Sequence, residues 1–287
     1  MIYFCADDYG LDEESCVHIN ECIEKGVLNK VSVFANFGQV DLNKLSLIKD
    51  LRLSLHLNLV EGKCMSDANQ IGLIADDKGN FKHTFTGLMK MSCVYGKAFE
   101  AQVYKEIRAQ VLYWKSVLPQ GKPFCIDSHQ HIHMIPGVFK ALLKVLSEEK
   151  IALEYMRIPT EPLLPYIKVP SLYLTYSGVN VIKQWLVNFL WLVNKKQAEK
   201  SRIKQSYFFG ILLSGKMDEK RVKKILPQYI KMAEKNSMDI EVVFHPGYFE
   251  NKGLDLKNNN IVFKDFYMSE NRKKEFEAVM NLERSEV

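Results

Sequence analysis

The sequence predicts a parallel β/α fold built on about seven strands. Three observations support this: short runs rich in β-branched and aromatic residues alternate with helical patterns, the alternation begins almost at the first residue, and no break in composition interrupts it. Such alternation is typical both of a barrel and of a doubly wound sheet. Periodicity does not separate these two architectures.

The predicted strands are short and are bounded by helical patterns or turn residues. In chain order they are Ile2–Ala6, Val31–Phe37, Leu53–Leu59, Phe124–His131, Leu153–Ile158, Tyr207–Leu212 and Ile240–His245.

Helical patterns lie between the strands. Asp12 can cap the first helix, which carries apolar residues on one face and has Gly26 just past its end. Pro136 is well placed to open a later helix. A last amphipathic helix is expected over Ser269–Leu282.

Length and composition favour one large domain. The chain has 287 residues and 47% hydrophobic content, enough for a single sizeable core. Because no repeat, low-complexity tract or linker is visible, we expect one domain over residues 1–287. Two long irregular stretches, 61–94 and 159–179, exceed what a plain β/α connection needs and are candidate substrate loops.

Charge and cysteine usage exclude several classes of protein. The net charge of +5 is spread along the chain apart from a short cluster at 195–202, and no nucleic-acid-binding motif accompanies it, so no nucleic-acid partner is expected. The first residues lack the pattern of a secretory signal, and the six cysteines have no CxxC spacing. We therefore expect a cytoplasmic protein whose cysteines are small apolar core residues.

The most apolar segment is 181–193, reading VIKQWLVNFLWLV. It is shorter than the roughly 20 apolar residues of a membrane span and contains polar residues, so a buried or interface helix is expected. The alternatives are a membrane-surface helix and a helix that joins two copies in a homodimer.

Titratable side chains gather at or just beyond the ends of the predicted strands, where a β/α barrel carries its catalytic residues. They follow the first, third, fourth, fifth and last strands. In chain order they are Asp7 and Asp8, His56 with Asn58, Asp127 with His129, His131 and His133, Arg157, and His245.

The adjacent carboxylates Asp7 and Asp8 repel each other and need a cation or a shared proton. A metal ion would supply the cation, whereas the alternative is that both residues cap the following helix.

The fourth strand strengthens the metal interpretation. Asp127, His129, His131 and His133 alternate, so in an extended strand all four would face one side. A site with one carboxylate, two imidazoles and no thiolate suits one divalent ion, with Mg²⁺, Zn²⁺, Mn²⁺ and Co²⁺ all acceptable.

Five motifs, in order, carry a family resemblance: ADDYG, SLHLNLVEG, DSHQHIHMIP, MRIPTE and VVFHPGY. Together they resemble the YdjC-like carbohydrate deacetylases, also called the ChbG/HpnK family, over nearly the whole chain. The resemblance implies a deformed, roughly seven-stranded β/α barrel that uses a divalent metal to remove acetyl groups from N-acetylated amino sugars or small chitooligosaccharides.

The resemblance also implies roles for individual residues. Asp8, His56 and His129 match the metal ligands, Asp7 the general base and His245 the general acid. Arg157 matches a residue that orients the base. The remaining candidates, Asp127, His131, His133 and Asn58, are expected behind the ligands or against the substrate.

The sequence departs from the family pattern at several positions. Cys5 stands where the family usually has Asn, Ser54 where it has Gly, and Lys63-Cys64 where Pro is usual. We expect these changes to affect substrate fit more than chemistry. The aromatic helix around Trp185–Trp191 is either a further specialisation or core packing.

Two other functions remain open at this stage. The chain could hydrolyse another amide or ester, because metal-bound water does not by itself select the acyl group. It could also be a catalytically silent sugar-binding protein, although the retained acid pair and imidazoles argue against that.

Overall fold

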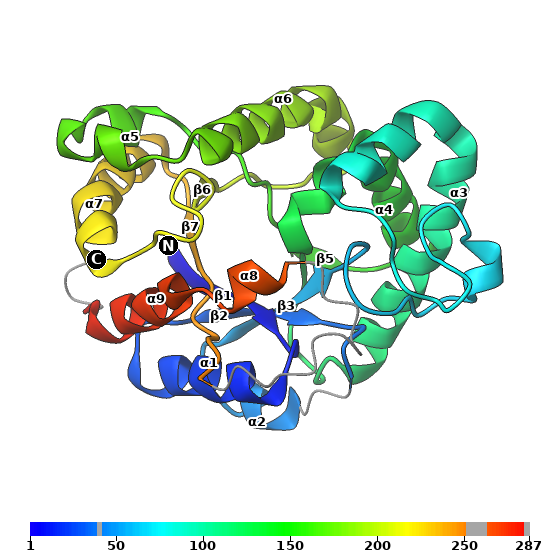
Figure 1. Ribbon diagram of the computed structural model, residues 1–287, viewed down its shortest axis with the longest axis horizontal. Coiled ribbons are helices and arrows are strands. Elements are labelled where there is room, and N and C mark those ends of the chain that lie inside the picture. Colours follow the sequence, from blue (N-terminus) through cyan, green and yellow to red (C-terminus); the bar gives the residue numbers. More distant parts are fainter. Residues whose placement is uncertain (39–41, 251–262, 284–287) are drawn as a thin grey trace.

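Seven parallel strands form one curled sheet at the centre of the molecule (Figure 1). The computed structural model describes residues 1–38, 42–250 and 263–283. The strands are β1 (Ile2–Tyr9), β2 (Lys30–Phe34), β3 (Arg52–Leu57), β4 (Phe124–Ser128), β5 (Leu153–Met156), β6 (Tyr207–Phe209) and β7 (Ile240–Phe244). Their order across the sheet is β5-β4-β3-β2-β1-β7-β6, with parallel pairing throughout. All seven predicted strands are confirmed.

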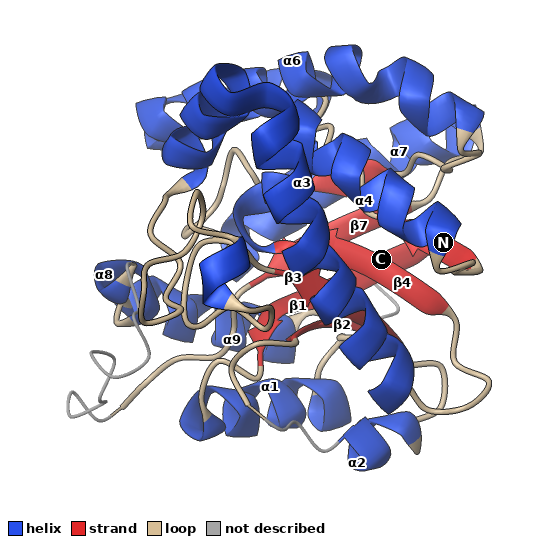
Figure 2. Ribbon diagram, turned by 90° about the vertical axis from the view of Figure 1, so that its right-hand side faces the viewer, coloured by secondary structure: helices blue, strands red, loops and turns tan. Residues whose placement is uncertain are grey.

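Helices surround this sheet, with α1 and α2 on one side and α3, α4 and α6 toward the other (Figure 2). The α-helices are α1 (Glu13–Lys25), α2 (Leu42–Ser46), α3 (Phe85–Val117), α4 (Pro136–Glu148), α5 (Leu164–Ile167), α6 (Gly178–Lys200), α7 (Glu219–Asn236), α8 (Lys264–Tyr267) and α9 (Glu270–Asn281). Short 3-10 helices cover Ala68–Gln70, His129–Met134 and Pro170–Thr175. Asp12 and Ser269 cap α1 and α9 as the sequence predicts.

The two edge strands, β5 and β6, approach each other. Tyr155 Oη lies 2.9 Å from Ser206 Oγ, and the Phe208 N–H donates to the Thr160 carbonyl at 3.4 Å. The sheet thus curls into an incompletely closed barrel. This arrangement confirms the deformed barrel and decides against the doubly wound alternative.

The first strand is irregular where the acidic pair lies. Its register with β2 shifts between Ala6 and Tyr9, and Asp8 has a φ of 67°, in the left-handed region. Side chains of adjacent residues on a regular strand point to opposite faces, so this break lets both carboxylates reach one site.

The fourth strand ends earlier than predicted. β4 stops at Ser128, and Gln130 and His131 have φ values of 51° and 58° inside the 3-10 helix that follows. The prediction that Asp127, His129, His131 and His133 share one face of an extended strand is therefore wrong.

The apolar segment 181–193 lies within α6, where it is buried on one face only. Trp191 is buried, but Trp185 and Phe189 are mostly exposed, so core packing explains only part of this aromatic set. Among the described residues, no helix is both long enough and apolar enough to cross a membrane.

The cysteines are all free, but they are not all core residues. Cys5, Cys22 and Cys125 are buried, as expected, whereas Cys93 is exposed and the other two are half-buried.

The buried carboxylate of Glu161 fixes the chain that follows β6. It accepts hydrogen bonds from the backbone N–H groups of Gly210, Ile211 and Leu212, at 2.7–3.1 Å, and from the Tyr166 hydroxyl at 2.5 Å. Because Glu161 follows β5 in the chain, these bonds join the two edges of the barrel.

Replacing Glu161 with Gln should destabilise the protein by about 1–3 kcal/mol, since the amide N–H₂ cannot accept and leaves a buried donor unpaired. Thermal unfolding of Glu161→Gln, compared with Glu154→Gln at an exposed position, measures this. Equal unfolding midpoints for the two variants would show that this carboxylate does not hold the barrel edges.

Candidate metal centre and catalytic residues

Three predicted ligands converge at the rim where β1, β3 and β4 end. Asp8 Oδ1 lies 3.5 Å from His56 Nε2 and 3.2 Å from His129 Nδ1. All three side chains are buried, and their ligand atoms lie within 4.8 Å of one another. Within the described residues, Asp8 Oδ1 and His56 Nε2 lack hydrogen-bond partners. Buried polar atoms are costly when unpaired, so this donor set fits a divalent ion.

Asp127 lies behind His56. The Nδ1 of His56 is 2.7 Å from Asp127 Oδ1, so the ring N–H points at the carboxylate and the Nε2 lone pair is left for a metal. The other oxygen, Oδ2, accepts from Ser32 Oγ at 2.6 Å and from Lys30 Nζ at 3.2 Å. Asp127 thereby fixes the orientation of His56.

Glu61 contacts His129 in the way that Asp127 contacts His56. Glu61 Oε2 lies 3.1 Å from His129 Nε2 and accepts from the Tyr267 hydroxyl at 2.6 Å. Burial alone would lower the pKa of His129, but the neighbouring carboxylates of Asp8 and Glu61 outweigh this effect and raise the pKa to about 9. Both imidazoles thus have a carboxylate on the side away from Asp8, the arrangement that aligns metal-binding histidines.

The predicted base, Asp7, is held by a fully buried arginine. Arg157 Nη1 and Nη2 donate to Asp7 Oδ2 and Oδ1 at 2.7 and 2.8 Å, and its Nε donates to Glu241 Oε1 at 3.0 Å. Burial favours the neutral acid, but the charges of Arg157 and His56 outweigh it and lower the pKa of Asp7 to about 2. Asp7 is therefore ionised at neutral pH and fixed in orientation.

Cys5 touches this base. Its Sγ lies 3.4 Å from Asp7 Oδ1 and 3.3 Å from Arg157 Nη2, and burial raises the pKa of the thiol well above its usual value. The substitution of Cys for the family's usual Asn thus lies beside the base, closer to the chemistry than the sequence suggested.

A second arginine reaches Asp8 from the last helix. Arg272 Nη2 pairs with Asp8 Oδ2, and Arg272 Nη1 donates to the Gly247 carbonyl at 2.6 Å. The charge of Arg272 outweighs the effect of burial and lowers the pKa of Asp8 well below its usual value. Asp8 therefore stays ionised, with Oδ1 directed to the imidazoles.

The charges in this network do not balance. Among the described residues it joins five carboxylates and three cations: Asp7, Asp8, Glu61, Asp127 and Glu241 with Lys30, Arg157 and Arg272. When both imidazoles are neutral, as they must be to bind a metal ion, the excess is two negative charges. Uncompensated charge is expensive in a buried site, so a divalent cation suits this centre electrostatically as well as geometrically.

His245 directly follows β7. The register pairs Ala6 with Phe244, so Asp7 and His245 come next after paired residues of neighbouring strands, at the same rim. Its Nδ1 is 3.5 Å from Glu275 Oε2, and its backbone N–H donates to the same oxygen at 2.6 Å.

Three other candidates have structural partners. His133 Nε2 lies 2.8 Å from the Arg157 carbonyl, and its Nδ1 contacts Ser128 Oγ. Burial lowers the pKa of His133 to about 4, so it is a neutral residue that supports the Arg157 backbone. Asn58 caps the turn leading to Glu61, accepting from the N–H groups of that residue and Val60. His131 packs against the ring of Phe208.

Five residues of the site were not predicted from the sequence: Lys30, Glu61, Glu241, Tyr267 and Arg272. Two of them could have been found from the sequence: Lys30 and Glu241 are charged residues within strands that are buried along their length, and a buried charge needs a partner. Glu61 belongs to a motif that was recognised, in one of the two predicted substrate loops. Tyr267 and Arg272 come from the C-terminal region, whose position relative to the rim no local pattern reveals.

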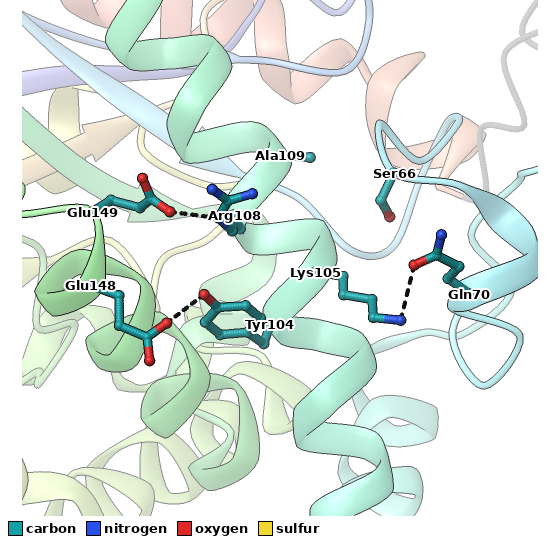
Figure 3. Close-up of a pocket in the computed structure, with 8 residues that line it drawn as sticks. All are labelled: Ser66, Gln70, Tyr104, Lys105, Arg108, Ala109, Glu148 and Glu149. Atoms are coloured by element: carbon teal, nitrogen blue, oxygen red, sulfur yellow. Dashed lines mark hydrogen bonds and ion pairs between the residues drawn. The ribbon is translucent and has the colours of Figure 1, made fainter.

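A separate concavity lies between α3, α4 and the 61–70 segment (Figure 3). Its charged side chains pair with their neighbours: Arg108 Nε with Glu149 at 2.5 Å, and Lys105 Nζ with Gln70 at 3.0 Å. None of the predicted site residues lines it, so we assign it no catalytic role.

The sequence model of the YdjC-like protein family matches residues 1–286. The chain belongs to the YdjC-like family. The predicted resemblance is thereby confirmed.

Curated relatives of this YdjC-like chain carry the name carbohydrate deacetylase. The relative from Xenopus laevis is 31% identical over 158 residues, covering 54% of this chain and 49% of that protein. The relative from Danio rerio is 29% identical over 157 residues, with the same coverage, and that from Clostridium beijerinckii is 24% identical over 192 residues, covering 64% and 73%. The matches thus span about half the length of the two vertebrate relatives.

A solved structure from Enterococcus faecalis V583, provisionally named a cellobiose-phosphate cleavage protein, has a similar fold. It superposes with a TM-score of 0.67 over 99% of this chain and 92% of that chain, at 14% identity. At this identity the likeness supports the fold and says nothing of substrate.

If Glu61 aligns His129, Glu61→Gln should weaken binding of Zn²⁺ or Mn²⁺ by about 10–100-fold. Calorimetric titration of the metal-free protein measures the affinity. Glu106→Gln is a matched control, because Glu106 is a buried carboxylate that holds the same loop through the Met65 and Ser66 N–H groups and contacts none of the ligands. Equal affinities for the two variants would contradict this role of Glu61.

Metal affinity should also rise with pH. Because the pKa of His129 is raised to about 9 without metal, the ring is protonated at pH 7 and must lose its proton to bind an ion. Affinity should therefore increase by about tenfold per pH unit from pH 7 and level off near pH 9, with about one proton released per ion. Titrations in buffers of different ionisation enthalpy count that proton, and a pH-independent affinity over this range would refute the assignment.

Proposed function

We propose that this chain is a metal-dependent hydrolase that removes the N-acetyl group from an acetylated amino sugar or small chitooligosaccharide and releases acetate. The main support is one observation: an ionised carboxylate, Asp7, is fixed by Arg157 beside the buried three-ligand group that contains Asp8. Family membership and the names of the relatives supply the reaction class.

The residues that would hold the ion are Asp8, His56 and His129. The ion would be Mg²⁺ or Zn²⁺, with Mn²⁺ and Co²⁺ as alternatives; imidazole ligands suit Zn²⁺, and carboxylate and water ligands suit Mg²⁺. When bound, such an ion polarises a carbonyl and lowers the pKa of coordinated water.

Asp7 would accept the proton of the attacking water. One of its oxygens lies within 4.8 Å of a ring nitrogen of His56, so the base borders the ligand group. Arg157 donates to both carboxylate oxygens, which restricts rotation of Asp7 and keeps it ionised. With these contacts, Asp7 would lie next to a water molecule bound at the ligand group and could accept its proton.

His245 would return a proton to the departing amine. It directly follows β7, whose last residue pairs with Ala6 of β1, so it lies at the same rim, and its Nδ1 is 3.5 Å from Glu275 Oε2. Because Nδ1 faces Glu275, the proton on Nε2 would be the one donated to the amine. Acetate and a free amino sugar would result.

Two alternatives remain, and substrate comparison separates them. A hydrolase of another amide or ester would use the same residues on a different acyl group. A silent sugar-binding protein would bind the sugar without turnover.

We favour a cytoplasmic location, in keeping with six free cysteines.

The decisive assay measures acetate released from N,N′-diacetylchitobiose and its 6-phosphate, before and after chelation and with metal restored. Asp7→Asn should lower turnover by about 10²–10⁴-fold because it removes the base, while metal affinity stays nearly unchanged.

Asp77→Asn, at an exposed position, should leave turnover at the wild-type value. An active Asp7→Asn variant would refute the assignment of the base. Metal binding without acetate from either sugar would point to another acyl substrate, and absence of metal binding would favour the silent protein.

A further inference from the structure

Helix α6 exposes a set of large apolar residues. Trp185, Phe189 and Leu192 are 64%, 60% and 68% exposed. The buried face of the helix combines apolar side chains with polar ones: Gln184 donates to the Glu161 carbonyl at 2.6 Å, and Asn194 donates to the Met134 carbonyl at 2.7 Å. Since this mixed face attaches the helix to the barrel, the exposed apolar side chains are not needed to hold it in place.

The exposed residues of α6 form a continuous apolar stripe. Its members are Val179, Ile182, Trp185, Phe189, Leu192 and Val193, which recur at helical spacing. Trp185, Phe189 and Leu192 also line a groove of about 660 Å³, whose other wall contains Pro162 and Leu163. Side chains of this size and exposure present on the order of 600 Å², at the upper end of the largest apolar patch on a typical monomeric protein.

The neighbouring helix extends this surface. Leu164 and Ile167 of α5 are more than half exposed, and α5 and α6 run along the same side of the molecule (Figure 1).

Positive charge is concentrated in the same segment. Residues 162–207 contain seven Lys and Arg residues and a single acidic one, Glu199, for a net charge of +6. The whole chain carries +5, so the rest of it has a net charge of −1. Three of the seven cations, Lys195, Lys196 and Lys200, are exposed and lie on α6 just beyond the apolar stripe.

We propose that the exposed face of α6 binds the surface of an anionic lipid membrane, with the helix lying in the plane of the interface. Trp, Phe and Leu side chains on one face with flanking Lys residues are typical of helices that enter the boundary between headgroups and acyl chains. The lysines would contact lipid phosphates. The absence of a membrane-spanning helix among the described residues is compatible with this, because the protein would lie on the membrane.

A second copy of the chain is the competing occupant. A two-fold contact over the stripe would place Lys195, Lys196 and Lys200 of both copies at the edges of one interface, and α6 offers a single acidic residue, Glu199, to offset them. Charge therefore favours an anionic surface over a homodimer.

Co-sedimentation with lipid vesicles tests the proposal on the full chain. Binding to vesicles containing one third phosphatidylglycerol should be at least tenfold tighter than to pure phosphatidylcholine, and should weaken as salt is raised. The double variants Trp185→Ser/Phe189→Ser and Lys195→Glu/Lys196→Glu should each weaken binding at least tenfold, by independent routes.

Matched controls come from the region of α2, on the opposite side of the molecule (Figure 1). Leu47→Ser removes another exposed apolar residue, and Lys44→Glu/Lys49→Glu reverses two other exposed charges. These variants should bind vesicles as the wild type does.

Absence of vesicle binding, or binding that both α6 variants leave unchanged, would overturn the proposal. Light scattering tests the competing occupant. If the wild type is a dimer that does not bind vesicles, and Trp185→Ser/Phe189→Ser converts it to a monomer, the stripe is assigned to a second copy. Vesicle binding needs no turnover, so these results do not depend on the proposed deacetylase activity.

Discussion

The rest of the site depends on Arg157, which lies buried between Asp7 and Glu241. A buried arginine must be paired on all sides, and here it fixes both oxygens of the base while Glu241 and Lys30 continue the network toward Asp127. Asp127 in turn orients His56. The position of the base and the direction of one ligand are therefore set by the same chain of ion pairs, which crosses the strands β1, β2, β4 and β7.

The arrangement suits a metal ion. Asp8 and two imidazoles present their ligand atoms to one another, and each imidazole is backed by a carboxylate. With both imidazoles neutral, as metal binding requires, the network has two negative charges in excess among the described residues. Both the geometry and the charge therefore suit a divalent cation. Arg272 contributes from α9 by holding Asp8 ionised, so the last helix belongs to the active centre as well as to the shell of the barrel.

Much of this could be predicted because strand ends in a parallel β/α fold meet at one rim. Asp7, Asp8, His56, His129 and Arg157 were identified in that way. Sequence reasoning failed where the backbone leaves regular geometry: after Ser128 the chain enters a left-handed turn, so His131 and His133 do not face the side that alternation implied. It also failed for Arg272 and Tyr267, whose approach to the site depends on packing between distant elements. The sequence left open whether the apolar side chains of 181–193 are buried, since composition does not show which face of a helix packs against the barrel.

The most direct test of the central claim is the location of a bound cation. A crystal of the protein soaked in Mn²⁺ or Zn²⁺ and measured at the absorption edge of the metal gives the ion's position from anomalous scattering. The account predicts one strong peak between Asp8 Oδ1, His56 Nε2 and His129 Nδ1. An ion bound elsewhere, or no peak at this centre with metal in excess, would contradict it.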